Sequence, residues 1–547
     1  MKLYEKFVTE ELNEDKTLNS LSFHAPSNFN FGYDVVDEWA KTNPDKKAMI
    51  WVADDESERI FTFKDISLMS NQVANFLKAK GVKKGDRVLL ILRRHYEFWL
   101  AIVALHKIGA IAIPATDQLK KKDVVYRIEK AGITCVLCTS DGTISGEVEL
   151  AAKDTGVDNL IIIGKKDGWT SFEEAYSYPD KCDRDPSLTI DDIMLMYFTS
   201  GTTSYPKMVA HTFAYPLGHF ITAKWWHNVS EDGLHFTVAE TGWGKAVWGK
   251  LYGQWLCGAC VFTYDFSKFD QDKVLKMIEK YKVTTFCAPP TIYRFLIKAD
   301  LNHYDLSSIV YATTAGEAVN PEVVNRFKEV TGLTLMEGFG QTETTLTIAN
   351  LIGTTPKLGS MGKASPQYKI ALLDSDSKPV PNGEVGEICI DYSEGIPYGM
   401  LKEYYRDKEK TDEAMHDGFY HTGDMAWCDE DGYFFYVGRT DDLIKSSGYR
   451  IGPFEVESAI MEHPSVLECA VTGAPDPVRG QVVKATIVLA KGYTPSEELK
   501  KEIQTFVKKA TAPYKYPRII DFVDELPKTI SGKIKRTEIR KGGQTQQ

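Results

Sequence analysis

The stretch Tyr197–Lys207 constrains the fold of this chain more than any other, and its sequence is YFTSGTTSYPK. The apolar residues 194–197 lead into small hydroxyl residues and one glycine, ending at Pro206 and Lys207. This order predicts a buried strand followed by a polar loop. Because such a loop turns backbone N–H groups and hydroxyls toward an anion, and its lysine adds a positive charge, it indicates a polyphosphate site. It is not a Walker A loop, since GxxxxGK[ST] is absent; a surface turn rich in Ser and Thr stays open.

The length and charge of the chain limit its class. At 547 residues it is too long for one hydrophobic core and predicts roughly three or four domains' worth of sequence. Hydrophobic residues make up 43% of the chain and aromatic residues 12%, as in a well-packed globular protein. The net charge of −11 argues against a general nucleic-acid binder, because phosphate backbones need a basic face. Any basic site for an anionic ligand is therefore expected to be local.

The N-terminal segment, MKLYEKFVTEELNEDK, is acidic and has no uninterrupted apolar core. It lacks the pattern of a secretory signal or of an Arg-rich transit peptide, so we expect a cytoplasmic protein. The sequence contains no run of 18 apolar residues. Its most apolar piece, Trp99–Ala115, contains His106 and Lys107 and is broken by Pro114, which favours a buried helix and strand over a membrane span.

Nine cysteines are scattered along the chain, and two pairs with CxxC spacing raise the question of zinc. Cys135 and Cys138 lie in an apolar run typical of a strand, where positions three apart face opposite sides and do not share a metal. Cys257 and Cys260 have no nearby histidine. We therefore expect buried, reduced, structural thiols.

From about Phe61 the sequence alternates between helical and strand patterns. Short apolar strands separated by helices predict a parallel sheet covered on both faces. The expected helices are 66–80, 96–108 and 123–130, and the expected strands are 87–92, 110–113, 134–138 and 160–163.

A further strand over 309–314 is expected to enter the turn 315–317. The helix after it has Asn320 as its N-cap, Pro321 at its first position and Gly332 as its stop. A parallel sheet presents its ligands at such strand ends, where loops precede helix N-termini. The turn and the phosphate loop are both expected in that setting.

After about Gly438 the sequence changes character, and we expect a small α+β domain over 441–547 behind a large domain over 1–440. Its expected helix 453–462 precedes strands over 467–472 and 482–489. Thr494 and Glu497 form a predicted capping box for a helix to Lys509, and 518–523 is the last expected strand.

Several motifs together resemble those of the adenylate-forming, or AMP-binding, enzymes. TSGTTSYPK resembles their phosphate loop TSG[ST]TGxPK, although Ser204 stands where the family has Gly and is strained if the loop needs a positive φ. In order, GFGQTET (338–344), YHTGD (420–424), GRTDD (438–442) and PKTISGK (527–533) also match. The resemblance runs from about Phe61 to Arg536 and implies a large multi-subdomain α/β body with a small mobile α+β domain.

The resemblance also implies roles for single residues. Phe339 is implied to stack on adenine. Asp424, assisted by Arg439, is implied to bind the ribose hydroxyls, for which a carboxylate is a suitable acceptor. Asp441 is the hinge. Thr342 contacts the α-phosphate and the acyl carboxylate, Glu343 holds Mg²⁺, and Lys533 is the adenylation lysine, so that the catalytic set is Lys533, Thr342, Glu343 and Lys207. The implied nucleotide-binding residues are Thr199, Ser200, Gly201, Thr202, Thr203, Ser204, Lys207, Gly316, Glu317, Glu337, Gly338, Phe339, Gly340, Gln341, Thr342, Asp424 and Arg439.

Within that family, SSGYRIGPFEVE, APDPVRG and TAPYKYPR look most like the medium-chain acyl-CoA synthetases. Arg450 is implied to lie toward the substrate. The implied CoA contacts are Gln118, Ser447, Gly448, Tyr449, Arg479 and Lys508. Acetyl-CoA synthetases carry Trp where this chain has Gly340, so the acyl pocket is expected to be larger here. Burying each additional methylene of the acid in that space would favour binding by about 0.8 kcal/mol. We therefore expect an acid longer than acetate, medium-chain or short and branched. Trp243 is a further candidate for this pocket and is as readily explained as plain core.

The expected function is an ATP-dependent acyl-CoA synthetase of fatty acid and lipid metabolism that uses ATP, Mg²⁺ and coenzyme A. The carboxylate first attacks the α-phosphorus of ATP, and the CoA thiol then attacks the acyl-adenylate, with the small domain rotating about Asp441 between the steps. Two alternatives stay open: an adenylation enzyme that loads an amino or aryl acid on a carrier protein, and a non-catalytic nucleotide sensor. Expected partners are small molecules, with neither nucleic acid nor a membrane span, and a homodimer stays open.

Overall fold

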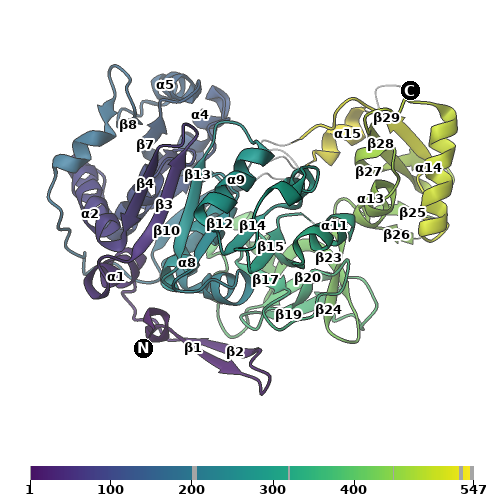
Figure 1. Cartoon of the computed structure of the whole chain (residues 1–547), viewed down its shortest axis with the longest axis horizontal. Helices are drawn as coiled ribbons and strands as arrows, with labels where there is room; N and C mark the ends of the chain where they lie inside the picture. The colour runs from purple at the N-terminus through teal and green to yellow at the C-terminus, as the bar shows by residue number, and fades with distance from the viewer. Residues whose placement is uncertain are drawn as a thin grey trace.

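The computed structural model of this chain describes residues 2–199, 206–317, 319, 321–447, 449–528 and 534–542. Within these ranges the chain forms sheets of eight, fourteen and five strands and one N-terminal hairpin, β1 (Val8–Leu12) with β2 (Leu18–Phe23). Figure 1 shows the two larger sheets in the main body and the five-stranded sheet at the C-terminal end. The expected α/β class is confirmed.

The eight-stranded sheet is the parallel, covered sheet that the alternating pattern predicts. Within this sheet, neighbouring strands from β10 to β9 run parallel to one another. Two antiparallel strands, β11 and β21, extend the sheet beyond β10. In spatial order its strands are β21 (Glu403–Tyr404), β11 (Lys207–Thr212), β10 (Ile193–Thr199), β6 (Ile111–Pro114), β5 (Arg87–Ile91), β7 (Ile133–Thr139), β8 (Leu160–Ile163) and β9 (Thr170–Ser171).

Strand β5 shows why this sheet has helices on both faces. Val88 and Leu90 pack in one core with α2 (Phe63–Ala79) and α3 (Glu97–Ile108). Leu89 and Ile91 pack in another core with α4 (Lys121–Ala131) and α5 (Ile144–Thr155). Successive strand residues point to opposite faces, so an all-apolar strand needs cover on both.

Helix α3 ends where the sequence predicts. All of its residues are buried, and Gly109 follows as the C-cap with φ +72°. A side chain there would be strained by that φ and would also meet Leu188, whose Cδ2 would lie 2.5 Å from an added Cβ. The turn at Gly109 leads directly into β6, as the short expected strand requires.

The fourteen-stranded sheet changes direction at β16. Between β3 and β16 each pair of neighbours is parallel, and β4 adds an antiparallel strand at the β3 edge. Between β16 and β19 each pair is antiparallel, so the loop after β16 lies at the junction. The spatial order is β19 (Lys369–Leu373), β20 (Gly386–Asp391), β23 (Phe419–Cys428), β24 (Tyr433–Arg439), β18 (Gly362–Ala364), β17 (Leu346–Ala349), β16 (Leu335–Gly340), β15 (Tyr311–Ala315), β14 (Thr285–Ala288), β12 (Leu234–Thr237), β13 (Cys260–Asp265), β3 (Lys47–Ala53) and β4 (Glu58–Thr62), with β22 (Met415–His416) beside β23.

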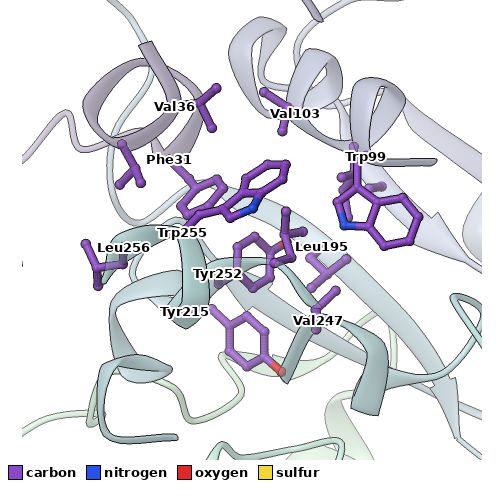
Figure 2. Close-up of a cluster of buried hydrophobic side chains, with 14 of the residues drawn as sticks. Phe31, Val36, Trp99, Val103, Leu195, Tyr215, Val247, Tyr252, Trp255 and Leu256 are labelled. Carbon is purple, nitrogen blue, oxygen red and sulfur yellow. The ribbon is translucent and has the colours of Figure 1, made fainter. Parts of the chain in front are cut away.

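One apolar core joins the two large sheets (Figure 2). Trp99 comes from α3 on the eight-stranded sheet, and Leu195 comes from β10. Tyr252 and Trp255 come from α8 (Tyr252–Leu256), which contacts β13 of the other sheet together with α7 (Gly244–Lys250). The Trp99 indole also donates to the Lys250 carbonyl at 2.7 Å. Because this core is closely packed, it fixes the position of one large sheet relative to the other.

The five-stranded sheet has a core of its own beneath α13 (Pro453–Met461) and α14 (Glu497–Ala510). Apolar residues of β27 and β28, such as Val471 and Ile487, pack there with Ile503 of α14. The expected helices and strands of this segment are confirmed, and its strands are β26 (Tyr449–Ile451), β25 (Ile444–Ser446), β28 (Gly480–Leu489), β27 (Val466–Asp476) and β29 (Ile519–Phe522).

The start of α14 corrects one prediction. The N-cap is Ser496, not Thr494, and its hydroxyl accepts a hydrogen bond from the Leu499 N–H at 3.0 Å. A cap residue must directly precede the first helical residue and accept from the amide two or three positions on. Ser496 meets both conditions for a helix that begins at Glu497, whereas Thr494 lies two residues too early.

The remaining described helices are shorter connectors. Asn320, the predicted N-cap of α11, lies outside the described residues. None of the helices in the described ranges is long and apolar enough to cross a bilayer. They are α1 (Glu38–Thr42), α6 (Tyr215–Gly218), α9 (Gln271–Tyr281), α10 (Pro290–Leu296), α11 (Pro321–Thr331), α12 (Lys408–Ala414) and α15 (Arg536–Gly542), with the 3₁₀ or π turns η1 (Leu3–Lys6), η2 (Gly32–Asp37), η3 (Phe172–Ser177), η4 (Thr222–Trp226) and η5 (Leu301–His303).

Candidate active site

Strands β10 and β11 form the two arms of the predicted phosphate loop. Thr199 ends β10 and pairs with Lys207 at the start of β11, so the ends of the loop are neighbours across an antiparallel pair. The strand that the sequence predicts ahead of the loop is therefore present. Five further predicted residues lie outside the described part of the chain: Ser200, Gly201, Thr202, Thr203 and Ser204.

Tyr404 connects two of the predicted motifs. The Lys207 ammonium lies 4.8 Å from the centre of the Tyr404 ring, and the Tyr404 hydroxyl donates to Glu343 Oε1 at 2.9 Å. Burial first, and then the Glu343 carboxylate, raise the pKa of Tyr404, so its hydroxyl remains a donor. Tyr404 was not predicted from the sequence, because it joins the site only through the pairing of β21 with β11.

The loop after β16 is held by its own glutamine. Tyr420 donates to Gln341 Oε1 at 2.8 Å, and Gln341 Nε2 donates to the Thr422 carbonyl at 2.8 Å and to Asp424 Oδ2. On the other side of the loop, a ring nitrogen of His211 lies 2.8 Å from the Thr342 carbonyl oxygen. Gln341 thereby joins GFGQTET to YHTGD, although the two motifs lie far apart in sequence.

Asp424 is the most enclosed carboxylate of the set, only 5% exposed. Tyr436 donates to its Oδ1 at 2.9 Å, and Arg439 Nη1 donates to its Oδ2 at 3.2 Å from the paired position on β24. The Phe339 and Tyr436 rings lie 6.2 Å apart, which brings the predicted adenine contact beside the predicted ribose contact. The structure therefore gathers Phe339, Asp424 and Arg439 at one place.

Glu337 and Gly338 precede Phe339 on β16, and both are buried. Burial raises the pKa of Glu337 to about 8, and one hydrogen bond, from the Val319 N–H at 3.4 Å, opposes that rise. At Gly338 an added Cβ would meet the Trp226 indole at 2.7 Å. The structure thus places both residues in the core beneath the loop.

The turn after β15 carries the predicted Gly316 and Glu317. Gly316 has φ +105°, which only glycine adopts without strain. Lys245 Nζ donates to the Ala315 carbonyl at 2.6 Å, so α7 brings a lysine to the end of β15 that sequence reasoning missed. Glu317 accepts a hydrogen bond from the Thr291 hydroxyl on α10.

Two predicted acyl-pocket residues, Trp243 and Thr342, lie close to the N-terminus of α7. Trp243 is the N-cap of this helix, and a Cβ added to Gly244 would lie 4.0 Å from Thr342 Cγ2. At Gly340 an added Cβ would lie 2.4 Å from the Trp248 indole. The space that a side chain at 340 would enter is thus taken by Trp248, which the sequence did not single out, so the expected open volume beside Gly340 is partly filled.

The predicted hinge lies between the two parts of the chain. The Asp441 carbonyl accepts a hydrogen bond from Arg540 on α15 at 3.2 Å, and Arg540 also pairs with Asp442. Arg536, on the same helix, donates to both oxygens of Glu457 on α13 at 2.7 Å. The start of the small sheet is thereby tied to the last described helix. Lys533 lies outside the described residues.

Three of the predicted CoA-binding residues, Ser447, Arg479 and Tyr449, can be placed by their contacts. Ser447 donates its N–H to the Arg479 carbonyl at 3.0 Å, and the Tyr449 ring stacks on Tyr514 with centres 4.1 Å apart. Arg450 is exposed on β26, and Gly448 lies outside the described residues.

The remaining two CoA candidates lie elsewhere. Lys508 stands 5.5 Å above the Tyr516 ring near the end of α14. Figure 1 shows α4, which begins three residues after Gln118, well away from β25 and β26. Helix α4 therefore does not approach the small sheet in this conformation.

Comparison with known protein families gives two matches. Residues 36–405 match the family described as AMP-binding enzyme, and residues 455–533 match the AMP-binding enzyme C-terminal domain. Rat acyl-coenzyme A synthetase ACSM3 is 41% identical over 541 residues, which cover 97% of this chain and 93% of that protein. Human acyl-coenzyme A synthetase ACSM4 is 40% identical over 540 residues, with the same coverage.

Solved structures share the whole fold. The anthranilate CoA ligase AuaEII, crystallised with anthranoyl-AMP, superposes with a TM-score of 0.87 at 30% identity and covers 95% of this chain and 98% of its own. A Brucella canis acyl-CoA synthetase superposes with a TM-score of 0.72 at 32% identity and covers 95% of each chain. The fold inferred from the motifs is confirmed.

The relatives overturn the expected cellular location. The rat and human synthetases are named as mitochondrial proteins, so the prediction of a cytoplasmic protein is wrong. That prediction depended on the lack of a recognisable leader at the N-terminus, and a missing pattern carries no positive information about location.

Proposed function

This chain belongs to the AMP-binding enzymes and is an ATP-dependent acyl-CoA synthetase, an acid–thiol ligase, and on that premise we propose how its residues carry out the reaction. A carboxylate oxygen of the acid attacks the α-phosphorus of ATP, and pyrophosphate leaves. The CoA thiolate then attacks the acyl carbonyl of the adenylate, and AMP leaves. Contacts among the described residues and the motif resemblance support the role of each residue.

The observation that carries these assignments is the bridge made by Gln341. Its amide donates to Asp424, whose carboxylate also accepts from Tyr436 and Arg439. Asp424 is therefore held rigidly, as a group must be to accept hydrogen bonds from the two ribose hydroxyls. The same loop carries Thr342, which we assign to the α-phosphate and the acyl carboxylate.

The contacts that join Lys207, Tyr404 and Glu343 form the part of the proposed site that would bind the ATP phosphates. We assign Lys207 to the phosphates, because the charge that develops there is stabilised by fixed cations. Glu343 offers a hard oxygen donor beside it, which suits Mg²⁺, and that ion would neutralise phosphate charge when bound. Lys533 is assigned to adenylation from the motif alone.

We propose a large domain over 1–440 and a small one over 441–547, with Asp441 as the hinge. Each of the two parts has a core of its own, and α15 contacts residues 441–442. The small domain would rotate about this point to bring the CoA-binding residues to the adenylate. In the described conformation helix α4, which follows Gln118 in sequence, and the β25–β26 hairpin lie apart, which fits the need for such a rotation.

The acid is proposed to be longer than acetate, medium-chain or short and branched, in keeping with a role in fatty acid metabolism. Gly244, directly after Trp243, approaches Thr342, and Trp248 approaches Gly340. Because Trp248 fills the volume beside Gly340, the depth available to the acyl chain depends on that indole. From the names of the relatives we also propose a mitochondrial location.

A panel of acids with MgATP and CoA tests the proposal. Purified protein is expected to form AMP and acyl-CoA with acids such as butyrate, isobutyrate or octanoate, and to be slower with acetate. Asp424→Ala is expected to abolish formation of the adenylate. Pyrophosphate exchange with amino acids but with none of these acids would instead favour an enzyme that loads a carrier protein, and no AMP with any acid would favour a nucleotide sensor.

A further inference from the structure

Three side chains of metal-ligating type converge beside the nucleotide-binding residues. They are Glu387 and Cys389 on β20 and His421 on β23, and their ligating atoms all lie within 4.8 Å of one another. Over the described ranges this is the one group of three or more His, Cys, Asp or Glu side chains with that geometry. None of these residues belongs to the proposed catalytic set.

The strand register explains why they meet. Cys389 and His421 are direct partners in the antiparallel β20–β23 pair, so their side chains share a face. Glu387 lies two residues before Cys389 and thus on the same face. The register shifts between Glu387 and Cys389, because the segment Thr422–Asp424 bulges out of β23. This bulge also carries Asp424, the proposed ribose ligand.

One ring nitrogen faces both other ligands. His421 Nδ1 lies 3.1 Å from Glu387 Oε2 and 3.4 Å from Cys389 Sγ. A neutral imidazole nitrogen offers either one proton or one lone pair, so a single hydrogen bond from it satisfies only one of the two partners. A cation at the centre would attract all three atoms together.

The two separations from His421 Nδ1 are compatible with a shared zinc ion, and the third, between Glu387 and Cys389, lies within 4.8 Å. A Zn–S bond of about 2.3 Å and a Zn–N bond of about 2.0 Å at a tetrahedral angle place sulfur and nitrogen about 3.5 Å apart, and the corresponding nitrogen–oxygen separation is about 3.3 Å. The observed 3.4 Å and 3.1 Å differ from these by only about 0.2 Å. The sulfur and imidazole donors favour Zn²⁺ over Mg²⁺ or Ca²⁺.

We propose that Glu387, Cys389 and His421 bind one Zn²⁺ ion, with water as its fourth ligand. The Glu387 and His421 side chains are 21% and 12% exposed, whereas Cys389 is fully buried, so the ion would enter past the glutamate and the imidazole. The other Glu387 oxygen accepts the Gly423 N–H at 2.7 Å, which fixes the carboxylate in place. The His416 ring stacks on His421 at 4.0 Å and orients the imidazole.

The ion would act on the neighbouring nucleotide site through the bulge. Glu387 holds Gly423, and His421 directly precedes Thr422, whose carbonyl accepts hydrogen bonds from Gln341 and Arg439. Fixing the two ligands therefore stiffens the segment that presents Asp424, and we expect tighter ATP binding when the ion is present. This consequence rests on the proposed function, whereas the ion site itself does not.

Metal binding is tested directly on the full chain. Protein stripped with a chelator is loaded with Zn²⁺ or Co²⁺, passed through a desalting column and measured for bound metal. We expect one ion per chain, and in the Co²⁺ form an intense near-ultraviolet absorption from the thiolate ligand. Cys389→Ser is expected to remove that absorption and to weaken Zn²⁺ binding at least about 100-fold.

Two further variants separate loss of a ligand from loss of folding. Cys428→Ser removes a thiol from β23, the strand of His421, where the sulfur donates to the Asp429 carbonyl, and is expected to keep the ion. His421→Asn is expected to lose it, as Cys389→Ser does, while the circular dichroism spectrum stays that of wild type.

The outcomes distinguish the two parts of the proposal. No retained ion, or equal retention by Cys389→Ser, would overturn the site and leave a plain Glu387–His421 ion pair. Retained Zn²⁺ with no change in the KM for ATP between stripped and loaded enzyme would overturn only the effect on the nucleotide site. Because metal stoichiometry and absorption need no turnover, the test of the ion site stands apart from any failure to form acyl-CoA, whereas the KM comparison needs an active enzyme.

Discussion

At the scale of single residues, the site depends on side chains that hold other side chains. Asp424 illustrates this, because three donors, Gln341, Tyr436 and Arg439, converge on its two oxygens. A carboxylate that is satisfied in this way is oriented before a ligand arrives, so less ordering is needed on binding.

Removing one of these donors is expected to weaken ATP binding. Tyr436→Phe deletes the hydroxyl that donates to Asp424 Oδ1, and a hydrogen bond to a charged group is worth about 1.5 kcal/mol or more, so the KM for ATP should rise about tenfold. Steady-state kinetics with ATP varied measure this. Tyr433→Phe is the matched control on the same strand, since its hydroxyl donates to the Thr355 carbonyl instead. An equal rise in both variants would contradict the assignment.

Glu337 gives a pH-dependent prediction. Burial raises its pKa from 4.5 to about 8 in the folded state, so the folded protein keeps a proton that the unfolded chain releases. Its contribution to stability is fully present below about pH 4.5 and is lost as pH rises toward 8. Glu337→Gln removes this loss, so the variant should gain on wild type between pH 5 and pH 9, by an amount on the order of 3 kcal/mol.

Urea unfolding at pH 5, 7 and 9 measures that gain. A difference between Glu337→Gln and wild type that stays constant across the three pH values would show that the carboxyl is not kept protonated in the fold.

At the scale of elements, termini and bulges decide where side chains point. The bulge at Thr422–Asp424 turns Asp424 toward the site, and Gly423 within it has φ +72°. Helix α14 shows the same dependence on a local detail, because its first turn is capped by Ser496 and not by the neighbouring Thr494.

The cap of α14 can be tested with two conservative changes. Ser496→Ala removes the oxygen that accepts the Leu499 N–H, and losing such a cap costs about 1 kcal/mol. Hydrogen exchange at the start of α14 should therefore quicken about fivefold. Thr494→Ala is expected to leave exchange in this turn unchanged. Faster exchange in the Thr494 variant alone would restore the cap predicted from sequence.

At the scale of the whole molecule, His95 links the two large sheets. Its Nδ1 lies 2.9 Å from Asp265 at the end of β13, and its Nε2 lies 3.2 Å from Asp141 just after β7. Burial alone would lower the pKa of His95, but hydrogen bonds to the two carboxylates raise it to about 10. The imidazolium thus bridges one sheet to the other.

This bridge predicts how stability varies with pH. The folded-state pKa lies above the ordinary 6.5, so the stabilisation is fully present below about pH 6.5 and is lost as pH rises through 10. His95→Gln should lower the free energy of unfolding by about 3 kcal/mol at pH 6, because it leaves two partly buried carboxylates without their cation, and by much less at pH 10.

Urea titration at pH 6 and pH 10 measures the effect. His303→Gln is the control, because His303 pairs with Asp300 on the surface and such pairs contribute less than about 1 kcal/mol. A cost for His95→Gln that is the same at both pH values would mean that the ring is neutral in the folded protein.

The sequence by itself determined the local structure and the family. The spacing of apolar residues located α3 and β5, and a glycine at the helix C-terminus located the end of α3 at Gly109. These features are local, because a helix or a strand is specified by its own residues and their immediate neighbours. The motifs determined which loops belong to the site, because each one is a short, continuous segment. The motifs did not determine where in the cell the protein is located, because the folded structure does not depend on its location.

Only the tertiary structure decided which side chains support those loops. Tyr404 reaches Glu343 from β21, and Trp248 reaches Gly340 from α7, in each case from a segment remote in sequence from the residue it approaches. Tyr436 lies close to Arg439 in sequence but contacts Asp424 through the pairing of β23 with β24. No local pattern distinguishes these rings from other core aromatics. The meeting of Glu387, Cys389 and His421 likewise depends on a register shift between β20 and β23. Such contacts arise from strand pairing over long sequence separations, so they become visible only when the sheets are assembled.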